Sequence, residues 1–265
     1  MAIMFCDRLS YGWTAQIARE FTMQTHGHYV INMALLGKTI APKHNIAIAI
    51  GSVLPDIPIF LFYVISKFIY KMPEAKIWGE AYYQPVWQNI IATSHSIPIA
   101  LIGFIICWFF DWKWGAILCV SMVCHCLLDL PVHHDDAHRH FYPFSDYRFN
   151  SPVSYWDVNH HAKIAAGVEF ALVLIATPFV MGLLRTPYTK GILILIDIAY
   201  LLTYSGMLGI NLLNLRSLKT LGLIAISLVT PFIVFFSTNK EKSLEKLQYY
   251  KIPLIDKFQS KKDLK

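Results

Sequence analysis

Charged residues are scarce in this sequence. Only 15% of the 265 residues are Asp, Glu, Lys or Arg, whereas 55% are hydrophobic, and the mean hydropathy is +0.45. Soluble domains carry about 25% charged residues, so this scarcity argues against a soluble protein and predicts a surface that largely meets lipid. Internal repeats and low-complexity segments are absent as well. We therefore expect an all-α fold, a polytopic membrane helical bundle.

Several other patterns are missing. The sequence has no Gly-x-Ser-x-Gly nucleophile elbow and no Gly-rich phosphate-binding loop, which argues against serine-hydrolase and nucleotide-hydrolase chemistry. The five cysteines follow no regular pairing pattern, so we expect no disulfide framework. Cys124 and Cys126 flank His125, but adjacent helical residues point about 100° apart, and we expect both thiols to pack as small apolar side chains.

Long apolar runs supply the expected membrane spans, each of which needs about 20 residues. Three of them lie near the C-terminus: Ala162 to Leu184, Gly191 to Leu213 and Ser217 to Phe236. Three earlier runs are interrupted by His, Asp, Ser and Pro: Asn45 to Tyr70, Asn89 to Phe110 and Trp114 to Leu130. The interruptions indicate helices that pack around something polar.

The order of these features predicts three regions. Residues 1–161 form a helical region that ends in a His/Asp-rich loop at 130–161, residues 162–238 form transmembrane helices, and residues 239–265 form a basic tail. The tail holds eight lysines against four acids and supplies much of the net charge of +6, so we expect no nucleic-acid partner. We expect a multi-pass protein of a bacterial inner membrane, and the Lys-rich tail after the last span favours a cytoplasmic C-terminus. Counting spans back from that tail places the His/Asp-rich loop outside.

Histidine is abundant where charge is otherwise rare. Six of the eleven histidines crowd, with several acids, into one stretch: His133, His134, Asp135, Asp136, His138, His140, Asp157, His160 and His161. Imidazole and carboxylate are the usual ligands of zinc, manganese and iron, and an apolar protein has no structural need for so many. The stretch therefore predicts a metal site or acid-base chemistry, and the loop is expected to cover a metal site.

The best-defined spacing is His125-x-x-x-Asp129, because residues four apart share one face of a helix and can reach the same cation. The alternative is a structural pair that caps the helix before Pro131.

Asp56 lies between two prolines that hold its backbone rigidly, and here the alternative is an N-cap for the following helix. Topology places His95 near the same outer end as His125 and Asp129.

Four short motifs follow one another along the chain: Gly27-His28, Leu54-Pro55-Asp56-Ile57, Thr93-Ser94-His95-Ser96 and His125-x-x-x-Asp129. In this order they resemble the YdjM-like membrane-bound metal-dependent hydrolases and are distantly similar to zinc-dependent phospholipase C. The resemblance covers about the first half of the chain. It implies a helical membrane-embedded enzyme whose metal ligands, or their immediate support, are His28, Asp56, His95, His125 and Asp129.

The chain departs from that family at two places. It has Pro58 and Ile59 where the family continues with a second Asp and a His, and it has Ile90-Ile91-Ala92 where the family has His-Arg-Gly. The stretch from His133 to His161 is the candidate replacement. We expect catalytic roles in acid-base chemistry or anion binding for five of its residues: His133, His134, Asp135, His138 and Arg139.

These residues predict a membrane-bound metal-dependent hydrolase that cleaves an ester or phosphoester bond with metal-activated water. A divalent metal, zinc before manganese or iron, is the expected cofactor. A site among membrane helices predicts a lipid or lipid-linked substrate. Two alternatives stay open: a metal-ion transporter or other non-catalytic metal-binding protein, with Glu169 and Asp197 along an ion path, and a haem protein with His95 and His125 as axial ligands.

Overall fold

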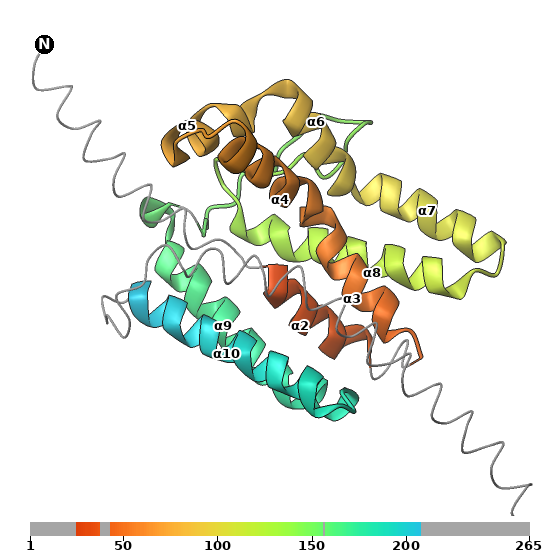
Figure 1. Ribbon diagram of the computed structural model, residues 1–265. Coiled ribbons are helices and arrows are strands. Elements are labelled where there is room, and N and C mark those ends of the chain that lie inside the picture. The colour runs from red at the N-terminus through yellow and green to blue at the C-terminus, as the bar shows by residue number, and fades with distance from the viewer. Residues whose placement is uncertain (1–24, 38–42, 156, 208–265) are drawn as a thin grey trace, which may run out of the picture.

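The computed structural model describes residues 25–37, 43–155 and 157–207 of the chain (Figure 1). Within these ranges the protein is helical and has no strand, which confirms the predicted all-α class. The α-helices are α2 (Thr25–Leu36), α3 (Asn45–Val53), α4 (Ile57–Val64), α5 (Glu74–Gly79), α6 (Pro85–Ser94), α7 (Ile97–Phe109), α8 (Lys113–Asp129), α9 (Ala162–Leu183) and α10 (Pro187–Met207). The expected span Ser217 to Phe236 and the basic tail lie outside the described residues.

Three helical stretches are long and apolar enough to cross a membrane: Asn45–Ile69, Lys113–Val132 and Ala162–Leu183. The first joins α3 and α4 through a 3-10 turn at Leu54–Asp56, and it ends in a π-helical turn at Ile65–Ile69. A fourth candidate consists of α6 and α7, which bend by 41° at the break between them. Two of the three early runs that polar residues interrupt are thus helices with a break, near Asp56 and near His95, whereas the third lies in the continuous helix α8.

Small and polar side chains fix α2, α3 and α8 against one another. A side chain at Gly51 of α3 would collide with the Leu118 carbonyl of α8, so only glycine allows this approach. The Asn32 amide on α2 donates to the Ser121 carbonyl at 2.9 Å, and the Ser121 hydroxyl donates to the Ile48 carbonyl at 2.7 Å. These bonds hold the three helices in one register, on which the site below depends.

Two apolar clusters surround this contact. One packs α2 and α3 against the antiparallel hairpin of α9 and α10, which lies along one side of the molecule in Figure 1. It includes Tyr29, Met33, Ile48, Val173, Val180, Leu193, Ile196 and Tyr200. The other is a largely aromatic cluster on α4, α5, α6 and the segment between α5 and α6: Phe62, Tyr63, Ile77, Tyr82 and Ile91, with Trp78 and Trp87 against it. The polar residues of the site lie between these clusters.

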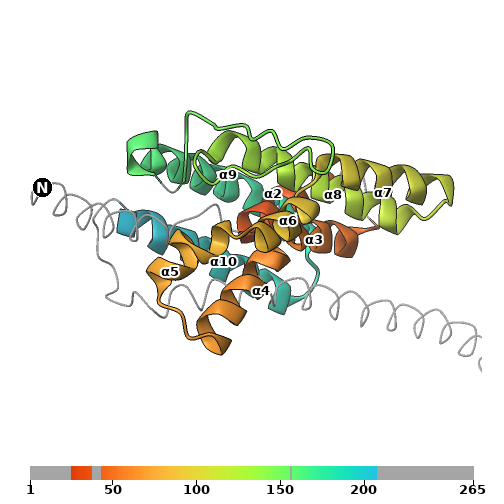
Figure 2. The same ribbon diagram turned by 90° about the horizontal axis from the view of Figure 1, so that it is seen from above.

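The loop between α8 and α9 runs along one face of the molecule, opposite the face on which α4 and α5 lie (Figure 2). Backbone bonds tie the loop to its own start, since Ser151 N donates to His133 O at 3.0 Å and Tyr155 N to Val132 O at 3.0 Å. A further backbone bond joins Ile97 N at the start of α7 to His140 O at 2.9 Å. Backbone bonds thus hold the His/Asp-rich loop to the end of α8 and to the start of α7.

Candidate metal centre

Asp129 is the hub of a buried polar cluster. Its Oδ1 lies 3.0 Å from His28 Nε2 and 3.5 Å from His133 Nε2, and its Oδ2 lies 3.2 Å from His125 Nε2 and 3.8 Å from His95 Nε2. The α8 helix places His125 and Asp129 one turn apart on the same face, as the spacing predicted. Four histidines from three helices and the loop therefore converge on one carboxylate.

Asp56 provides a second carboxylate that faces the same Nε2 atoms of His95 and His125. Its Oδ1 lies 3.3 Å from His95 Nε2 and 3.6 Å from His125 Nε2, and its Oδ2 accepts a 2.5 Å hydrogen bond from Thr25 Oγ1. Neither Asp56 nor Asp129 makes a side-chain capping bond to the helix end beside it. The geometry therefore favours the metal hypothesis over the capping alternative at both positions.

Backbone carbonyls orient two of the rings. His125 Nδ1 lies 2.8 Å from Ser52 O, and His95 Nδ1 lies 3.0 Å from Ile91 O. A carbonyl oxygen can only accept, so each Nδ1 carries the proton and each Nε2 presents its lone pair to the carboxylates. Metal-binding histidines in proteins are oriented in this way by an acceptor behind the ring.

Two groups of side chains have the spacing needed to hold a metal ion: His28 with Asp56 and His125, and His95 with Asp129 and His138. In each group the three ligand atoms lie within 4.8 Å of one another. The five residues that the resemblance implied as ligands or their support are thus all present, distributed over both groups. The sixth, His138, was predicted as a catalytic residue, and the structure places it beside His95 with the rings stacked at 4.1 Å.

The chemistry of the cluster fits a cation. His125 Nε2 and His28 Nδ1 are buried and have no hydrogen-bond partner. His28, His95 and His125 are at most 1% exposed and Asp129 is 3% exposed, so burial of its charge is costly unless a positive charge compensates. A divalent ion would accept the unpaired lone pairs and offset the carboxylate charge together.

The loop adds three buried histidines with different electrostatic surroundings. Burial alone would lower the pKa of His133, but the carboxylates of Asp136 and Asp129 raise that pKa well above its usual value. Burial and the neighbouring rings of His95 and His133 hold the pKa of His138 well below its usual range. Burial also lowers the pKa of His140 to about 4. His138 is therefore a neutral imidazole suited to ligation, whereas His133 is suited to hold a proton.

Three of the predicted catalytic residues make their contacts away from the two groups. His134 Nδ1 donates to Ser151 O at 2.5 Å, and Asp135 is paired with His134 across 3.5 Å. Arg139 donates to Asp146 at 2.7 Å and to Asn89 at 2.6 Å, so its guanidinium ties the loop to α6. In the described part of the chain, the loop residues brought to the carboxylates are His133 and His138.

Two positioning residues were missed by the sequence reasoning. Thr25 donates to Asp56, and the Ser52 carbonyl accepts from His125. Thr25 precedes His28 by three positions and so lies on the same helix face. This spacing could have identified Thr25 from the sequence. Nothing in the sequence marks the Ser52 carbonyl, because a backbone acceptor is shared by every residue type.

The geometry also bears on the two alternatives. Glu169 accepts from Tyr200 Oη, and Asp197 accepts from Thr177 Oγ1 at 2.8 Å, so both acids bond across the α9–α10 hairpin. The Nε2 atoms of the two proposed haem ligands both face Asp56 Oδ1. That arrangement suits a small cation between the rings and not a macrocycle.

Comparisons of the chain with protein-family models, with curated proteins and with solved structures find no match.

Proposed function

We propose that this protein is a membrane-bound metal-dependent hydrolase that cleaves an ester or phosphoester bond of a lipid or lipid-linked substrate. One observation carries the proposal: two carboxylates, the buried Asp129 and the partly buried Asp56, are shared between the two histidine groups. Asp56 Oδ1 faces His125 of the first group and His95 of the second, and Asp129 Oδ2 faces the same two rings. Carboxylates between adjacent sites are a recurrent feature of hydrolytic centres that use two ions about 3.5–4 Å apart.

Zinc is the expected metal because the ligand set combines imidazole nitrogen with carboxylate oxygen, and manganese and iron accept the same set. When bound, a divalent ion polarises a scissile carbonyl or phosphoryl group and lowers the pKa of water so that hydroxide is available near neutral pH. The carbonyls of Ser52 and Ile91 hold the His125 and His95 rings in position without rearrangement.

His133 is the residue we assign to proton transfer. Its Nδ1 lies 2.7 Å from Asp136 Oδ2, which fixes the ring, and its Nε2 lies 3.5 Å from Asp129 Oδ1 at the edge of the centre. A histidine held between two carboxylates can deliver a proton to a leaving group without moving its ring. Asp136 then acts as the positioning residue of His133.

The surroundings favour a lipid or lipid-linked substrate. The centre takes residues from two of the three apolar helical stretches, from the bend between α6 and α7, from α2 and from the loop, so a soluble substrate would have to enter a largely apolar environment. Aromatic side chains of the covering loop are exposed nearby in sequence, among them Phe144 at 72% and Tyr147 at 58%. Aromatic residues of this kind collect at membrane–water interfaces. The resemblance to YdjM-like hydrolases points to the same substrate class.

Metal content tests the first half of the proposal. Wild type, His125→Ala and Asp129→Ala are purified in detergent, and bound metals are measured by elemental analysis. We expect metal in the wild type and its loss in both variants. Matched controls are His44→Ala and Asp111→Asn, a histidine and an acid outside both groups, which should keep wild-type metal. Equal metal content in the wild type and the two centre variants would overturn the proposal.

Turnover tests the second half. Release of head groups or phosphate from a panel of lipids is measured with metal-loaded wild type in mixed micelles, and metal movement is measured in sealed vesicles of the same lipids. Hydrolysis that disappears in His125→Ala supports the proposal. Metal flux without hydrolysis would instead identify the transporter alternative.

A further inference from the structure

The break between α6 and α7 frees one backbone carbonyl from its helical partner. In an unbroken helix the His95 carbonyl would accept from the backbone N–H four positions later, at Ile99. Here Ile99 N is bonded to the Ser96 hydroxyl at 3.1 Å instead. His95 is 0% exposed, and a buried carbonyl oxygen is costly without a donor. Its donors therefore come from outside the helix.

Two side chains supply hydrogens to this carbonyl. The Cys126 thiol on α8 donates to His95 O across 3.2 Å, and His140 Nδ1 in the loop between α8 and α9 donates across 3.1 Å. Both side chains are buried, with exposed fractions of 0% and 3%. A carbonyl oxygen has two lone pairs, so it can accept both hydrogen bonds at once.

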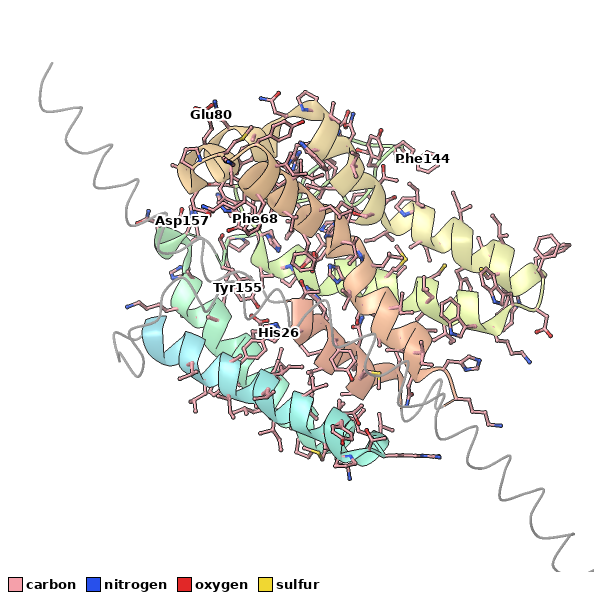
Figure 3. The ribbon with its side chains drawn as sticks, in the orientation of Figure 1. His26, Phe68, Glu80, Phe144, Tyr155 and Asp157 are labelled. Carbon is pink, nitrogen blue, oxygen red and sulfur yellow. The ribbon has the colours of Figure 1, made fainter. Side chains whose placement is uncertain are left out.

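The loop is fastened to the same bend by its backbone. Ile97 N donates to His140 O at 2.9 Å, and the Ser96 hydroxyl donates to the Tyr142 carbonyl. Figure 3 shows the loop, marked by Phe144, beside the bend between α6 and α7. These bonds keep the His140 ring where its Nδ1 reaches the freed carbonyl.

Cys126 connects the bend to the helix that carries two of the candidate ligands. It follows His125 directly and precedes Asp129 by three positions on α8. The thiol bonds the backbone of His95, whose Nε2 lies 3.3 Å from Asp56 Oδ1 and 3.8 Å from Asp129 Oδ2. We expected this thiol to pack only as a small apolar side chain, but the structure gives it a polar partner.

We propose that Cys126 and His140 are positioning residues of the metal centre, which hold the His95 carbonyl and thereby set the His95 ring against the two carboxylates. The ring itself is oriented from within α6, because its Nδ1 bonds Ile91 O at 3.0 Å. The two donors fix the backbone of the same residue from α8 and from the loop. The inference rests on the metal site of the proposed function, but not on hydrolysis.

Zinc affinity tests the role of the thiol. It is measured by competition with a chelating dye, on the full chain in detergent, for wild type, Cys126→Ala and Cys126→Ser. A thiol is a weak donor, so we expect Cys126→Ala to bind zinc about 10-fold more weakly, at the low end of the effect of ligand-supporting groups. Cys126→Ser keeps a donor and should bind close to the wild-type level. Alanine and serine are similar in volume, so equal losses in both variants would overturn the proposal.

Cys124→Ala is the matched control. Cys124 is a half-buried thiol on the other side of His125 and packs against an apolar cluster, so this variant should bind zinc as the wild type does. A loss equal to that of Cys126→Ala would overturn the proposal.

The second donor gives an independent comparison, which also serves if Cys126→Ser does not fold. His140→Asn keeps an amide nitrogen near the position of Nδ1, whereas His140→Ala removes the donor. We expect weaker zinc binding in His140→Ala than in His140→Asn. Equal affinities in these two variants would contradict the role of His140.

Infrared spectra of the metal-free protein test the thiol bond without any ion. The S–H stretching band moves to lower wavenumber when the thiol donates a hydrogen bond. Difference spectra of the wild type against Cys126→Ser and against Cys124→Ser isolate the two bands, and we expect the Cys126 band at the lower wavenumber. Coincident bands would overturn the proposal. A wild type that binds no zinc would instead overturn the proposed function, whatever the positions of these bands.

Discussion

Two regions of this molecule hold acids between apolar helices, and the acids have different partners in the two regions. In the metal centre, Asp56 and Asp129 face imidazole Nε2 atoms that carry lone pairs. In the α9–α10 hairpin, Glu169 and Asp197 accept hydrogen bonds from the hydroxyls of Tyr200 and Thr177.

The two regions differ in whether the partner of each carboxyl group offers a hydrogen or a lone pair. A hydroxyl supplies a hydrogen to its carboxyl group, so this hydrogen bond forms without an ion. A neutral imidazole whose Nδ1 proton is already committed to a carbonyl has only a lone pair to offer, and lone pairs facing carboxylates require a proton or a cation between them. The centre could therefore hold an ion, whereas the hairpin acids join two packed helices.

The largest expected contrast compares isosteric changes in the two regions. Asp129→Asn should reduce metal affinity by more than about 100-fold, because changes that only touch the support of a ligand already cost about 10–100-fold. Hydrolysis should be lost with the metal. Glu169→Gln should keep wild-type metal content. Elemental analysis of both purified variants measures their metal content. An equal loss of metal in the two variants would contradict the proposed difference between the two regions.

His133→Gln sharpens the comparison inside the centre. If His133 transfers protons without holding the ion, turnover should fall by about 10²–10⁴-fold while metal content stays at the wild-type level. The pH profile of turnover should also lose one of its limbs. Metal loss in parallel with turnover would instead show that His133 acts by positioning Asp129.

Thr25→Val removes the hydroxyl that donates to Asp56 Oδ2 at 2.5 Å and keeps the shape of the side chain. We expect metal affinity to fall by about 10–100-fold, since Asp56 loses its orienting bond. Thr93→Val is the control, because the exposed Thr93 hydroxyl bonds only the carbonyl of Asn89 one turn earlier. Zinc titration should separate the two variants, and matching affinities would contradict the role of Thr25.

The smallest effect is expected at Asp197. Asp197→Asn leaves an acceptor for Thr177 Oγ1, so we expect about 1 kcal/mol or less of lost stability, a shift of a few degrees in the thermal midpoint. Metal content and hydrolysis should stay unchanged. A strong loss of metal flux in vesicles would instead favour an ion path through the hairpin.

Much of the centre was predictable because it depends on local periodicity. His125 and Asp129 share a face since both lie on one regular helix, and the prolines around Asp56 mark a break from the sequence alone. The inclusion of His28 rested on a resemblance and that of His95 on the topology as well, and the structure places both within 4 Å of Asp129. The all-α class followed from long apolar runs for the same local reason.

The covering loop was far less predictable. The sequence marked it as polar and reactive, but it gave no means to tell His138, which lies beside His95, from His134, which stacks on His160. Arg139 was expected to bind an anion, whereas its bonds to Asp146 and Asn89 tie the loop to α6. An irregular loop has no periodicity from which side-chain orientations could be predicted. Long-range hydrogen bonds set those orientations, and the spacing of residues in the sequence does not reveal them.

The sequence by itself determined that the protein has apolar helices and that His and Asp side chains lie on them, because hydropathy and helical periodicity are properties of neighbouring residues. The tertiary structure alone decided that two carboxylates are shared between two histidine groups and that the pair of His134 and His160 stands apart from both. Those facts arise from helices whose register is set by Gly51 and the Asn32–Ser121 bonds, and from loop bonds such as Ser151 to His133. Contacts between residues far apart in the chain depend on how the helices and the loop pack. That packing decides which histidine rings lie beside which carboxylates.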